Sequence, residues 1–231
     1  MSKKIVVLTG AGMSADSGLK TFRDENGLWE GHDVMEVASP YGFAKNPDLV
    51  LEFYNQRRRQ LRQAAPNKGH EALAALESHY EVTIITQNVD DLHERAGSTE
   101  VVHLHGELFK VRSTGNPHLV LPWKEDVILG TKCPEGHQLR PHIVWFGEEV
   151  PLLPLAANIT TSADILLVIG TSLQVYPAAG LLHYSPPGIP IYLVDPKPTL
   201  SAGDFPNLSV ISKTAAEGVP TLVADLIRKA V

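Results

Sequence analysis

The chain has 231 residues, of which 43% are hydrophobic and 20% are charged, and its formal net charge is −6 at pH 7. This length buries enough apolar surface for one large domain, with or without a smaller inserted one, so folding requires neither disulfides nor metals. The acidic balance argues against nucleic-acid and anionic-membrane partners, and the single cysteine, Cys133, excludes an internal disulfide.

The N-terminal lysines precede only a short apolar run, Ile5–Leu8, which is too short for the core of a signal peptide. No segment approaches the roughly 20 apolar residues that a membrane span requires. Together with a lone cysteine, which fits a reducing compartment, these features predict a cytoplasmic protein.

Short apolar runs bounded by turn residues recur along the chain and indicate buried parallel strands. The predicted strands are Lys4–Thr9, Glu81–Thr86, Val101–Leu104, Asp164–Gly170 and Ile191–Asp195. Helical periodicity marks three further segments, Pro47–Ala64, Lys68–Ser78 and Glu217–Lys229. The alternation predicts an α/β fold with a doubly wound, Rossmann-like parallel sheet.

Two stretches interrupt this alternation. Residues 31–68 delay the second strand well beyond the roughly 30 residues of a plain βαβ unit, and they are predicted to form a helical insertion. Residues 109–140 are polar, rich in Gly, Pro and His, and are predicted to form a loop-rich or β-ribbon module. We therefore expect a Rossmann-like domain of residues 1–30, 69–108 and 141–231 and a smaller domain formed by the two insertions.

A glycine-rich turn, Gly10-Ala11-Gly12-Met13-Ser14-Ala15, follows the first strand and matches the pattern G-x-G-x-x-[GA]. Here Gly10 would permit a tight turn, Gly12 would let backbone approach a pyrophosphate, and a helix would begin facing the anion. Such a segment is also often only a turn. Asp195, at the end of a later strand, would suit the adenosine ribose, or equally a turn before Pro196. The pattern favours a dinucleotide without specifying a dehydrogenase.

Polar side chains follow the next two predicted strands. Gln87, Asn88 and Asp90 follow the second strand and His105 follows the third, so all four should lie at the carboxyl edge of the sheet. An imidazole with a pKa near 6.5 suits a general base. The alternatives are a structural or exposed histidine and a polar loop in which Asp90 caps a helix.

Five segments, in order across nearly the whole chain, resemble the sirtuin family. They are GAGMSADSGLKTFRDENGLW (10–29), TQNVDDLHERAG (86–97), HLHGEL (103–108), PHIVWFGE (141–148) and GTSLQVYPA (170–178). The resemblance implies NAD-dependent removal of acyl groups from protein lysines. The acyl oxygen would attack the nicotinamide ribose, giving free lysine, nicotinamide and O-acyl-ADP-ribose. NAD would be consumed, and acyl-lysine proteins or peptides would be the partners.

The resemblance also assigns roles to single residues. His105 would be the catalytic base, and Asn88 and Asp90 would orient the nicotinamide end, with Gln87 on the ribose. Phe22 and Arg23, otherwise readable as a hydrophobic staple and a solvated charge, would belong to a cofactor-binding loop. Further expected NAD contacts are Gly10, Ala11, Gly12, Ser14, Gly170, Thr171, Ser172, Asp195 and Ala215. The segment expected to pair with an extended substrate peptide is Val144, Trp145, Phe146 and Gly147.

Tyr54 and Arg57 lie three residues apart on a predicted helix and share a face. General surface statistics alone favour a core tyrosine and a solvated arginine. The segment FYNQRRRQL, however, resembles bacterial and other class III sirtuins, in which Y-x-x-R reads the carboxylate of succinyl-, malonyl- or glutaryl-lysine. A guanidinium fork and a phenol hydroxyl match a carboxylate. Ala38 matches a small residue that leaves the acyl channel roomy, so acetyl-lysine should also be used.

The chain departs from the family pattern at its second insertion. Most sirtuins carry two C-x-x-C pairs there for structural zinc, whereas this chain offers Cys133, His137 and a distant His118. Structural zinc needs four protein ligands, so we expect none. The insertion would then be held by packing around Leu119, Val120, Leu121, Trp123 and Ile128. Asp195 stands where the family commonly has Asn.

Three other functions compete with deacylation. A mono-ADP-ribosyltransferase would use the same NAD site but transfer ADP-ribose to protein. A non-catalytic NAD-binding module would not need His105, Asn88 and Asp90 together. A Rossmann dehydrogenase is disfavoured by the long interruption between the first two predicted strands.

Overall fold

The centre of the molecule is a six-stranded parallel sheet. The computed structural model describes residues 3–20, 28–29, 31–201 and 203–230. The sheet order is β11-β10-β9-β1-β4-β5, and read from β5 it runs 3-2-1-4-5-6 in chain order, as in dinucleotide-binding sheets. The predicted α/β fold is therefore confirmed. Its strands are β1 (Lys4–Thr9), β4 (Glu81–Thr86), β5 (Val101–His103), β9 (Ile165–Ile169), β10 (Ile191–Val194) and β11 (Leu208–Ile211).

The sixth strand, β11, is not predicted by the apolar pattern. It has only four residues and lies at the edge of the sheet, where just Leu208 is buried. A half-exposed edge strand lacks the continuous apolar run that marks the central strands. The other five strands agree with the predicted ranges to within two residues at either end.

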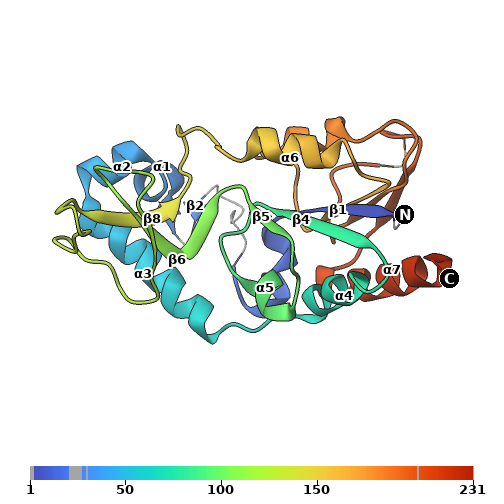
Figure 1. The fold of residues 1–231 in the computed structure, drawn as a ribbon, viewed down its shortest axis with the longest axis horizontal. Helices are drawn as coiled ribbons and strands as arrows, with labels where there is room; N and C mark the ends of the chain where they lie inside the picture. The colour runs from blue at the N-terminus through green and yellow to red at the C-terminus, as the bar shows by residue number, and fades with distance from the viewer. Residues whose placement is uncertain (1–2, 21–27, 30, 202, 231) are drawn as a thin grey trace.

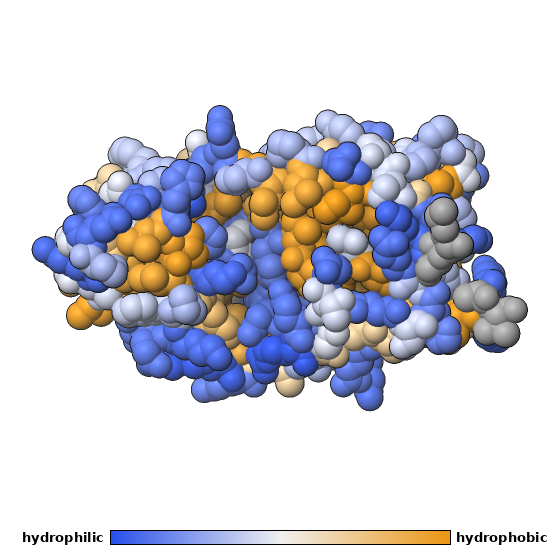
Figure 2. All heavy atoms as spheres, viewed as in Figure 1, coloured by the Kyte–Doolittle hydropathy of each residue, from blue (hydrophilic) through white to orange (hydrophobic). Residues whose placement is uncertain are grey.

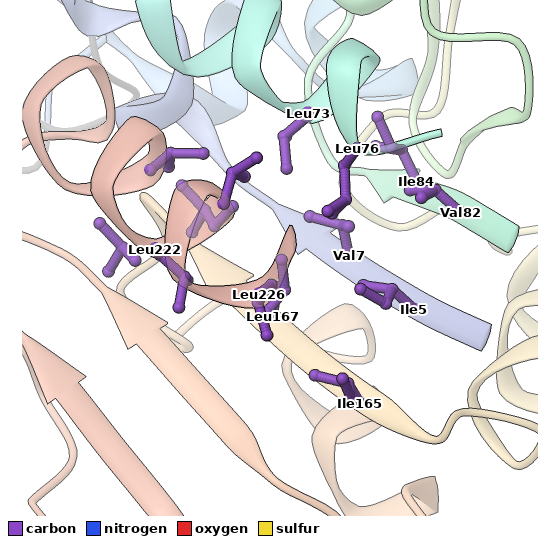
Figure 3. Packing of buried hydrophobic residues seen from close by; sticks show 14 of the residues in the cluster. Ile5, Val7, Leu73, Leu76, Val82, Ile84, Ile165, Leu167, Leu222 and Leu226 are labelled. Carbon is purple, nitrogen blue, oxygen red and sulfur yellow. The ribbon is translucent and has the colours of Figure 1, made fainter. Parts of the chain in front are cut away.

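Helices cover both faces of the sheet, which explains why the central strands are apolar throughout. Ile5 and Val7 of β1 pack against α4 and α7, as Figure 3 shows. Val6 and Leu8 belong to the cluster on the other face, under α6 and the 3₁₀ segment η3. Figure 1 shows α4 and α7 on one side and α6 on the other. These elements are α4 (Lys68–Leu76), α6 (Leu153–Thr160), η3 (Ala178–Tyr184) and α7 (Ala215–Ala230).

The prediction that an α-helix begins directly after the glycine turn is wrong. The chain forms two 3₁₀ turns instead, η1 (Ala11–Met13) and η2 (Ala15–Ser17). Gly18 ends the second turn with a φ of 85°, a left-handed conformation that stops helical growth. Among the described residues, the turn itself therefore opens 3₁₀ turns and not an α-helix, while the start of α7 (Ala215–Ala230) lies beside it, where the Ala216 N–H donates to the Asp16 carboxylate at 3.2 Å.

Three helices and a three-stranded antiparallel sheet form what we call the small module (residues 34–63 and 106–143). They lie together at the end of the molecule opposite the C-terminal part of α7 (Figure 1). The division of the chain into two domains stays a prediction. The elements are α1 (Val34–Val37), α2 (Pro40–Lys45), α3 (Pro47–Gln63), β6 (Gly106–Ser113), β7 (Val120–Pro122) and β8 (Leu139–Ile143), and the remaining ones are β2 (Leu28–Trp29), β3 (His32–Asp33) and α5 (Leu92–Ala96).

The packing of the small module differs in part from the expectation. Its inner cluster is formed by Leu51, Val111, Val127, Cys133 and Leu139, with Leu119, Leu121 and Trp123 around it. Ile128, expected in this core, is 66% exposed. On the face drawn in Figure 2, hydrophobic side chains gather in two areas, over the small module and beside α6, with hydrophilic side chains between them.

A buried amide ties the second insertion to α3. The Asn55 side chain donates to the carbonyl oxygen of Val127 at 2.9 Å and accepts from its backbone N–H at 2.8 Å. Asn55 is 2% exposed. Both bonds satisfy backbone groups that water does not reach, so they fix the loop before β8 against the helix. Within the described residues, no helix is long and apolar enough to span a membrane.

We expect Asn55→Ala to lower the free energy of unfolding by about 1–3 kcal/mol, because it leaves a buried N–H and a buried C=O without partners. Urea denaturation followed by circular dichroism measures this loss. Gln56→Ala, at an exposed position on the same helix, serves as control and should change stability by less than about 0.5 kcal/mol. Equal effects of the two substitutions would contradict the tether.

Candidate active site

A cleft of about 600 Å³ lies between the carboxyl edge of the parallel sheet and the small module. Its walls come from the glycine turn, the loops after β4, β5, β9 and β10, α3, and the segment after β8. It brings together most of the predicted site residues. These are Gly10, Ala11, Gly12, Ser14, Ala38, Tyr54, Arg57, Gln87, Asn88, Asp90, His105, Val144, Trp145, Phe146, Gly147, Gly170, Thr171, Ser172 and Asp195.

Three predicted contacts are not among these residues. Phe22 and Arg23 lie outside the described residues. Ala215 does not line the cleft, because its side chain is turned into the core cluster beneath α7. The preceding residue, Thr214, lines the cleft in its place.

The glycine turn is packed directly against the loop after β9. The backbone N–H of Gly12 donates to the carbonyl oxygen of Gly170 at 2.8 Å, and that of Gly10 donates to Ile169 at 3.0 Å. A Cβ on Gly12 would lie 2.7 Å from the Cα of Gly170, and one on Gly10 would lie 2.7 Å from the Cβ of Thr171. The glycines are therefore required for the two loops to meet at the point where the strand order reverses.

The loop after β4 joins the same structure. The Gln87 backbone N–H donates to the carbonyl oxygen of Thr9 at 2.9 Å, and its side chain donates to the Thr171 hydroxyl at 3.3 Å. Three loops from neighbouring strands are thus linked by hydrogen bonds. The edge of the sheet is held in one arrangement before any ligand arrives.

A buried hydrogen-bond network surrounds Ser14. Its hydroxyl donates to the Asp90 carboxylate at 2.9 Å and accepts from the Asn88 side-chain amide at 3.1 Å. Burial raises the pKa of Asp90, while the bonds from Ser14 and the Leu92 backbone oppose that rise. Because Leu92 begins α5 and donates to Asp90 at 3.2 Å, the helix-start and cleft interpretations of Asp90 both hold geometrically.

His105 lies beside the same loop. Its Nδ1 is 3.1 Å from the carbonyl oxygen of Gln87. A carbonyl only accepts, so Nδ1 carries the hydrogen and Nε2 keeps the lone pair of the neutral ring. Burial lowers the pKa of His105, and the bond to Gln87 only partly offsets this. The ring is therefore neutral at pH 7, with Nε2 able to accept a proton.

His103, two residues earlier, has a different environment. Its Nε2 lies 2.7 Å from the Glu94 carboxylate and its Nδ1 lies 3.2 Å from the Asn88 carbonyl oxygen. Burial acts to lower the pKa of His103, but the Glu94 carboxylate outweighs it and the net pKa is raised. The two histidines thus contact the carbonyl oxygens of consecutive residues, and of the two only His105 lines the cleft.

The far end of the cleft is formed by aromatic and basic side chains. The Tyr54 hydroxyl oxygen accepts from Trp145 Nε1 at 2.9 Å, and Tyr54 is fully buried. The Arg57 guanidinium lies 3.4 Å from the centre of the Phe53 ring and donates to the Phe53 carbonyl oxygen at 2.6 Å. Tyr54 is therefore a core residue that also lines the cleft, and Arg57 is half-buried rather than solvated.

The segment after β8 continues along one cleft wall. The Val144 N–H donates to the backbone carbonyl oxygen of His105 at 2.9 Å, and the Phe146 N–H donates to that of Ala38 at 2.9 Å. The Trp145 N–H donates to the Glu148 carboxylate at 2.8 Å. These three donors are occupied within the chain. An extended peptide could therefore not pair with these three N–H groups, and the Trp145 carbonyl oxygen is also occupied, by the Glu148 N–H.

Asp195 lies at the cleft edge and also forms a local turn. Its carboxylate accepts from the Lys197 backbone N–H at 2.8 Å. Burial raises the pKa of Asp195, and this hydrogen bond opposes the rise. The turn-forming interpretation is thus correct, and the second carboxylate oxygen is the one that would remain for a ribose hydroxyl.

The sequence did not predict the buried threonine and histidine side chains that lie behind Ser14. Thr9 donates to the Thr86 hydroxyl at 2.8 Å, His93 Nε2 is 3.1 Å from Thr9, and His70 Nε2 is 3.5 Å from Ser14. Burial lowers the pKa of His70 to about 4, so its ring is neutral. The available signal was a threonine ending each of two adjacent apolar strands, since a buried hydroxyl there requires a partner.

Comparison with known proteins places these features in one family. Residues 10–177 match the family model described as the Sir2 family. The chain is 57% identical to an NAD-dependent protein deacylase of Helicobacter pylori, over 99% of each chain. It is 54% identical to one of Bacteroides thetaiotaomicron, over 97% of this chain and 98% of the relative. A solved Sir2 homologue in complex with NAD is 41% identical, with a TM-score of 0.89 over 99% of this chain and 91% of that one. The chain therefore belongs to the Sir2 family.

Proposed function

We propose that this protein is an NAD-dependent protein-lysine deacylase that accepts acidic acyl groups as well as acetyl. The observation that carries the proposal is the neutral His105 ring in the same cleft as the Gly10–Gly12 turn. The names of the relatives, NAD-dependent protein deacylase, support the reaction class.

NAD is the co-substrate in this proposal, and the cleft residues suit its parts. The Gly10 and Gly12 N–H groups already donate within the chain, so the Ala11 N–H is the donor of the glycine turn that would face the pyrophosphate, and Asp195 would accept hydroxyl hydrogens of the adenosine ribose. The amide of Asn88, held by Ser14, would meet the nicotinamide carboxamide. These groups are already held by protein hydrogen bonds, so little ordering remains for binding.

His105 would act as the general base. Its Nδ1–H is fixed by the Gln87 carbonyl oxygen, which keeps Nε2 as the acceptor. The proton it takes would come from a hydroxyl of the NAD ribose once nicotinamide has left. The products would be the free lysine, nicotinamide and O-acyl-ADP-ribose. The small module forms one wall of the cleft, which would limit competition from bulk water.

The end of the cleft lined by Tyr54 and Arg57 suits the binding of an acidic acyl group. Burial raises the pKa of Tyr54, so the phenol stays protonated and able to donate. Arg57 supplies the charge that a distal carboxylate needs when it leaves water. Ala38 has no side chain beyond Cβ and leaves room for a longer acyl chain.

We expect kcat/KM for deacylation to be constant from pH 8 to about 6.5 and to fall at lower pH. Burial lowers the pKa of His105, and the base works only when neutral, so the loss begins below the usual histidine pKa of about 6.5. Steady-state rates on an acetyl-lysine peptide, with nicotinamide release as readout, measure the profile.

His105→Ala should lower kcat by at least about 100-fold, and the exposed His118→Ala is the matched control. An acid limb centred above pH 7, or an active His105→Ala variant, would contradict the assigned base. Mass spectrometry separates the competing reaction, because ADP-ribose left on the protein would replace O-acyl-ADP-ribose as product.

We expect Arg57→Met to raise KM for a succinyl-lysine peptide by roughly 10- to 100-fold, because a charge-assisted hydrogen bond is lost. The effect on an acetyl-lysine peptide should be much smaller. Arg59→Met is the control, since Arg59 lies on the same helix and pairs with Glu52 and Asp126. Equal losses on both peptides would refute the role of Arg57.

We also propose that the small module is held without zinc. Cys133 lies in an apolar cluster, and its Sγ is 3.3 Å from the Ser113 hydroxyl oxygen, to which it donates. No group of three or more His, Cys, Asp or Glu side chains in the described part of the chain is arranged to hold a metal ion. This donor set does not fit a four-ligand zinc site.

Removing metal should therefore leave the protein unchanged. We expect elemental analysis to find roughly less than 0.1 zinc per chain, and the Tm to agree within about 1 °C before and after dialysis against a chelator. Deacetylation rates should also agree. One zinc per chain with a Tm that falls on chelation would contradict the proposal.

A further inference from the structure

The Tyr54 hydroxyl is held in one orientation by a neighbouring side chain. Trp145 Nε1 lies 2.9 Å from the Tyr54 oxygen. An indole N–H only donates, so the phenol oxygen is the acceptor in this bond. The hydroxyl hydrogen must then be donated elsewhere. The direction of this hydrogen bond, from the Trp145 N–H to the Tyr54 oxygen, therefore follows from the two functional groups themselves.

No acceptor for that hydrogen lies within hydrogen-bond distance among the described residues, where Trp145 is the partner of the hydroxyl. Tyr54 has an exposed fraction of 0%, so solvent does not supply one in this arrangement. A buried O–H without an acceptor costs free energy. Because Tyr54 lines the cleft, an acceptor atom of a bound ligand is the group that would complete it.

The Trp145 indole ring is held in place by neighbouring side chains. The Arg140 guanidinium lies 3.3 Å from the centre of the Trp145 ring, and Phe43 packs against it at 5.3 Å. Arg140 in turn donates to the Glu148 carboxylate at 2.7 Å, and Glu148 accepts from the Trp145 backbone N–H at 2.8 Å. Backbone and ring of Trp145 are thus fixed by one charged cluster, so its N–H cannot turn away from Tyr54.

The local charge favours an acceptor that is negative. Glu148 is shared by Arg112 and Arg140, which leaves the cluster with one more positive than negative charge. The Arg57 guanidinium also lies close enough to Tyr54 to act on it electrostatically, as Arg140 does. A carboxylate at the end of an acyl chain would meet a donated O–H in a positive environment.

We propose that Trp145 is a positioning residue for acyl selectivity, whose indole N–H holds the Tyr54 oxygen so that the hydroxyl hydrogen is directed to an acceptor at the distal end of the acyl group. The ligand class is a lysine acylated with a dicarboxylic acid. This inference rests on the proposed deacylase function and deepens it.

The test is a double-mutant cycle on acyl selectivity, defined as kcat/KM for succinyl-lysine divided by that for acetyl-lysine peptide. Trp145→Phe removes the N–H and keeps an aromatic ring. We expect it to lower the selectivity about tenfold, mainly through KM for the succinyl peptide. Tyr54→Phe should do the same, and the double variant should fall no further.

Trp29→Phe is the matched control. The Trp29 ring lies as far from the Tyr54 ring as the Trp145 ring does, 6.2 Å in both cases, whereas the hydroxyl is bound by Trp145. Any effect of Trp29→Phe should persist unchanged in the Tyr54→Phe background. If Trp145→Phe fails to fold by circular dichroism, replacing Trp145 with benzothienylalanine removes the N–H and retains the ring shape.

Two results would overturn the inference. One is a Trp145→Phe variant that slows both peptides equally, which indicates packing alone. The other is a loss of selectivity that is fully additive with Tyr54→Phe. The Arg57→Met variant separates failure of this inference from failure of the proposed function. If Arg57→Met lowers the selectivity and Trp145→Phe does not, only the role of Trp145 is wrong. If neither changes selectivity, the acidic-acyl preference itself is wrong.

Discussion

The contact between the glycine turn after β1 and the loop after β9 is the constraint on which the cleft depends. Two backbones approach so closely there that a single methylene group on Gly12 would collide with Gly170. This contact closes the gap at the reversal of strand order and fixes the floor of the cleft. The loops after β4 and β9 are joined to it through Gln87. The site is therefore built on main-chain hydrogen bonds and does not rely on a long helix.

A second layer of neutral polar groups lies behind that floor. Thr9, Thr86, His70 and His93 are all fully or almost fully buried, and they hold one another and Ser14 without a net charge. Low local dielectric strengthens each of these bonds and penalises any member left unpaired. From this layer His70 contacts Ser14, which is hydrogen-bonded to the side chains of both Asn88 and Asp90. Orientation of these side chains thus depends on residues that do not line the cleft.

The sequence predicted the sheet well because its central strands are buried on both faces and carry continuous apolar runs. It also placed Asn88, Asp90 and His105 at one edge, since parallel strands end on the same side. It failed at β11, which is half-exposed, and at the helix expected after Gly12, which short-range hydrogen bonds replace with two 3₁₀ turns.

Other features were beyond a one-dimensional pattern. The bond between Trp145 and Tyr54 joins residues 91 positions apart, so no local spacing reveals it. The dual part played by Asp90 depends on which oxygen meets which donor. The side chain of Ala215 lies in the core cluster at the start of α7, next to Gly69, a packing detail that a family resemblance does not contain.

Helix α3 contacts the cleft on one face and the second insertion on another. Tyr54 and Arg57 lie toward the cleft, while the adjacent Asn55 and Arg58 lie against the β-sheet insertion, bound to Val127 and Leu108. Arg58 is itself fully buried. Any change in the insertion that moved Asn55 or Arg58 would therefore also displace the Tyr54 and Arg57 side chains, which line the cleft from the same helix.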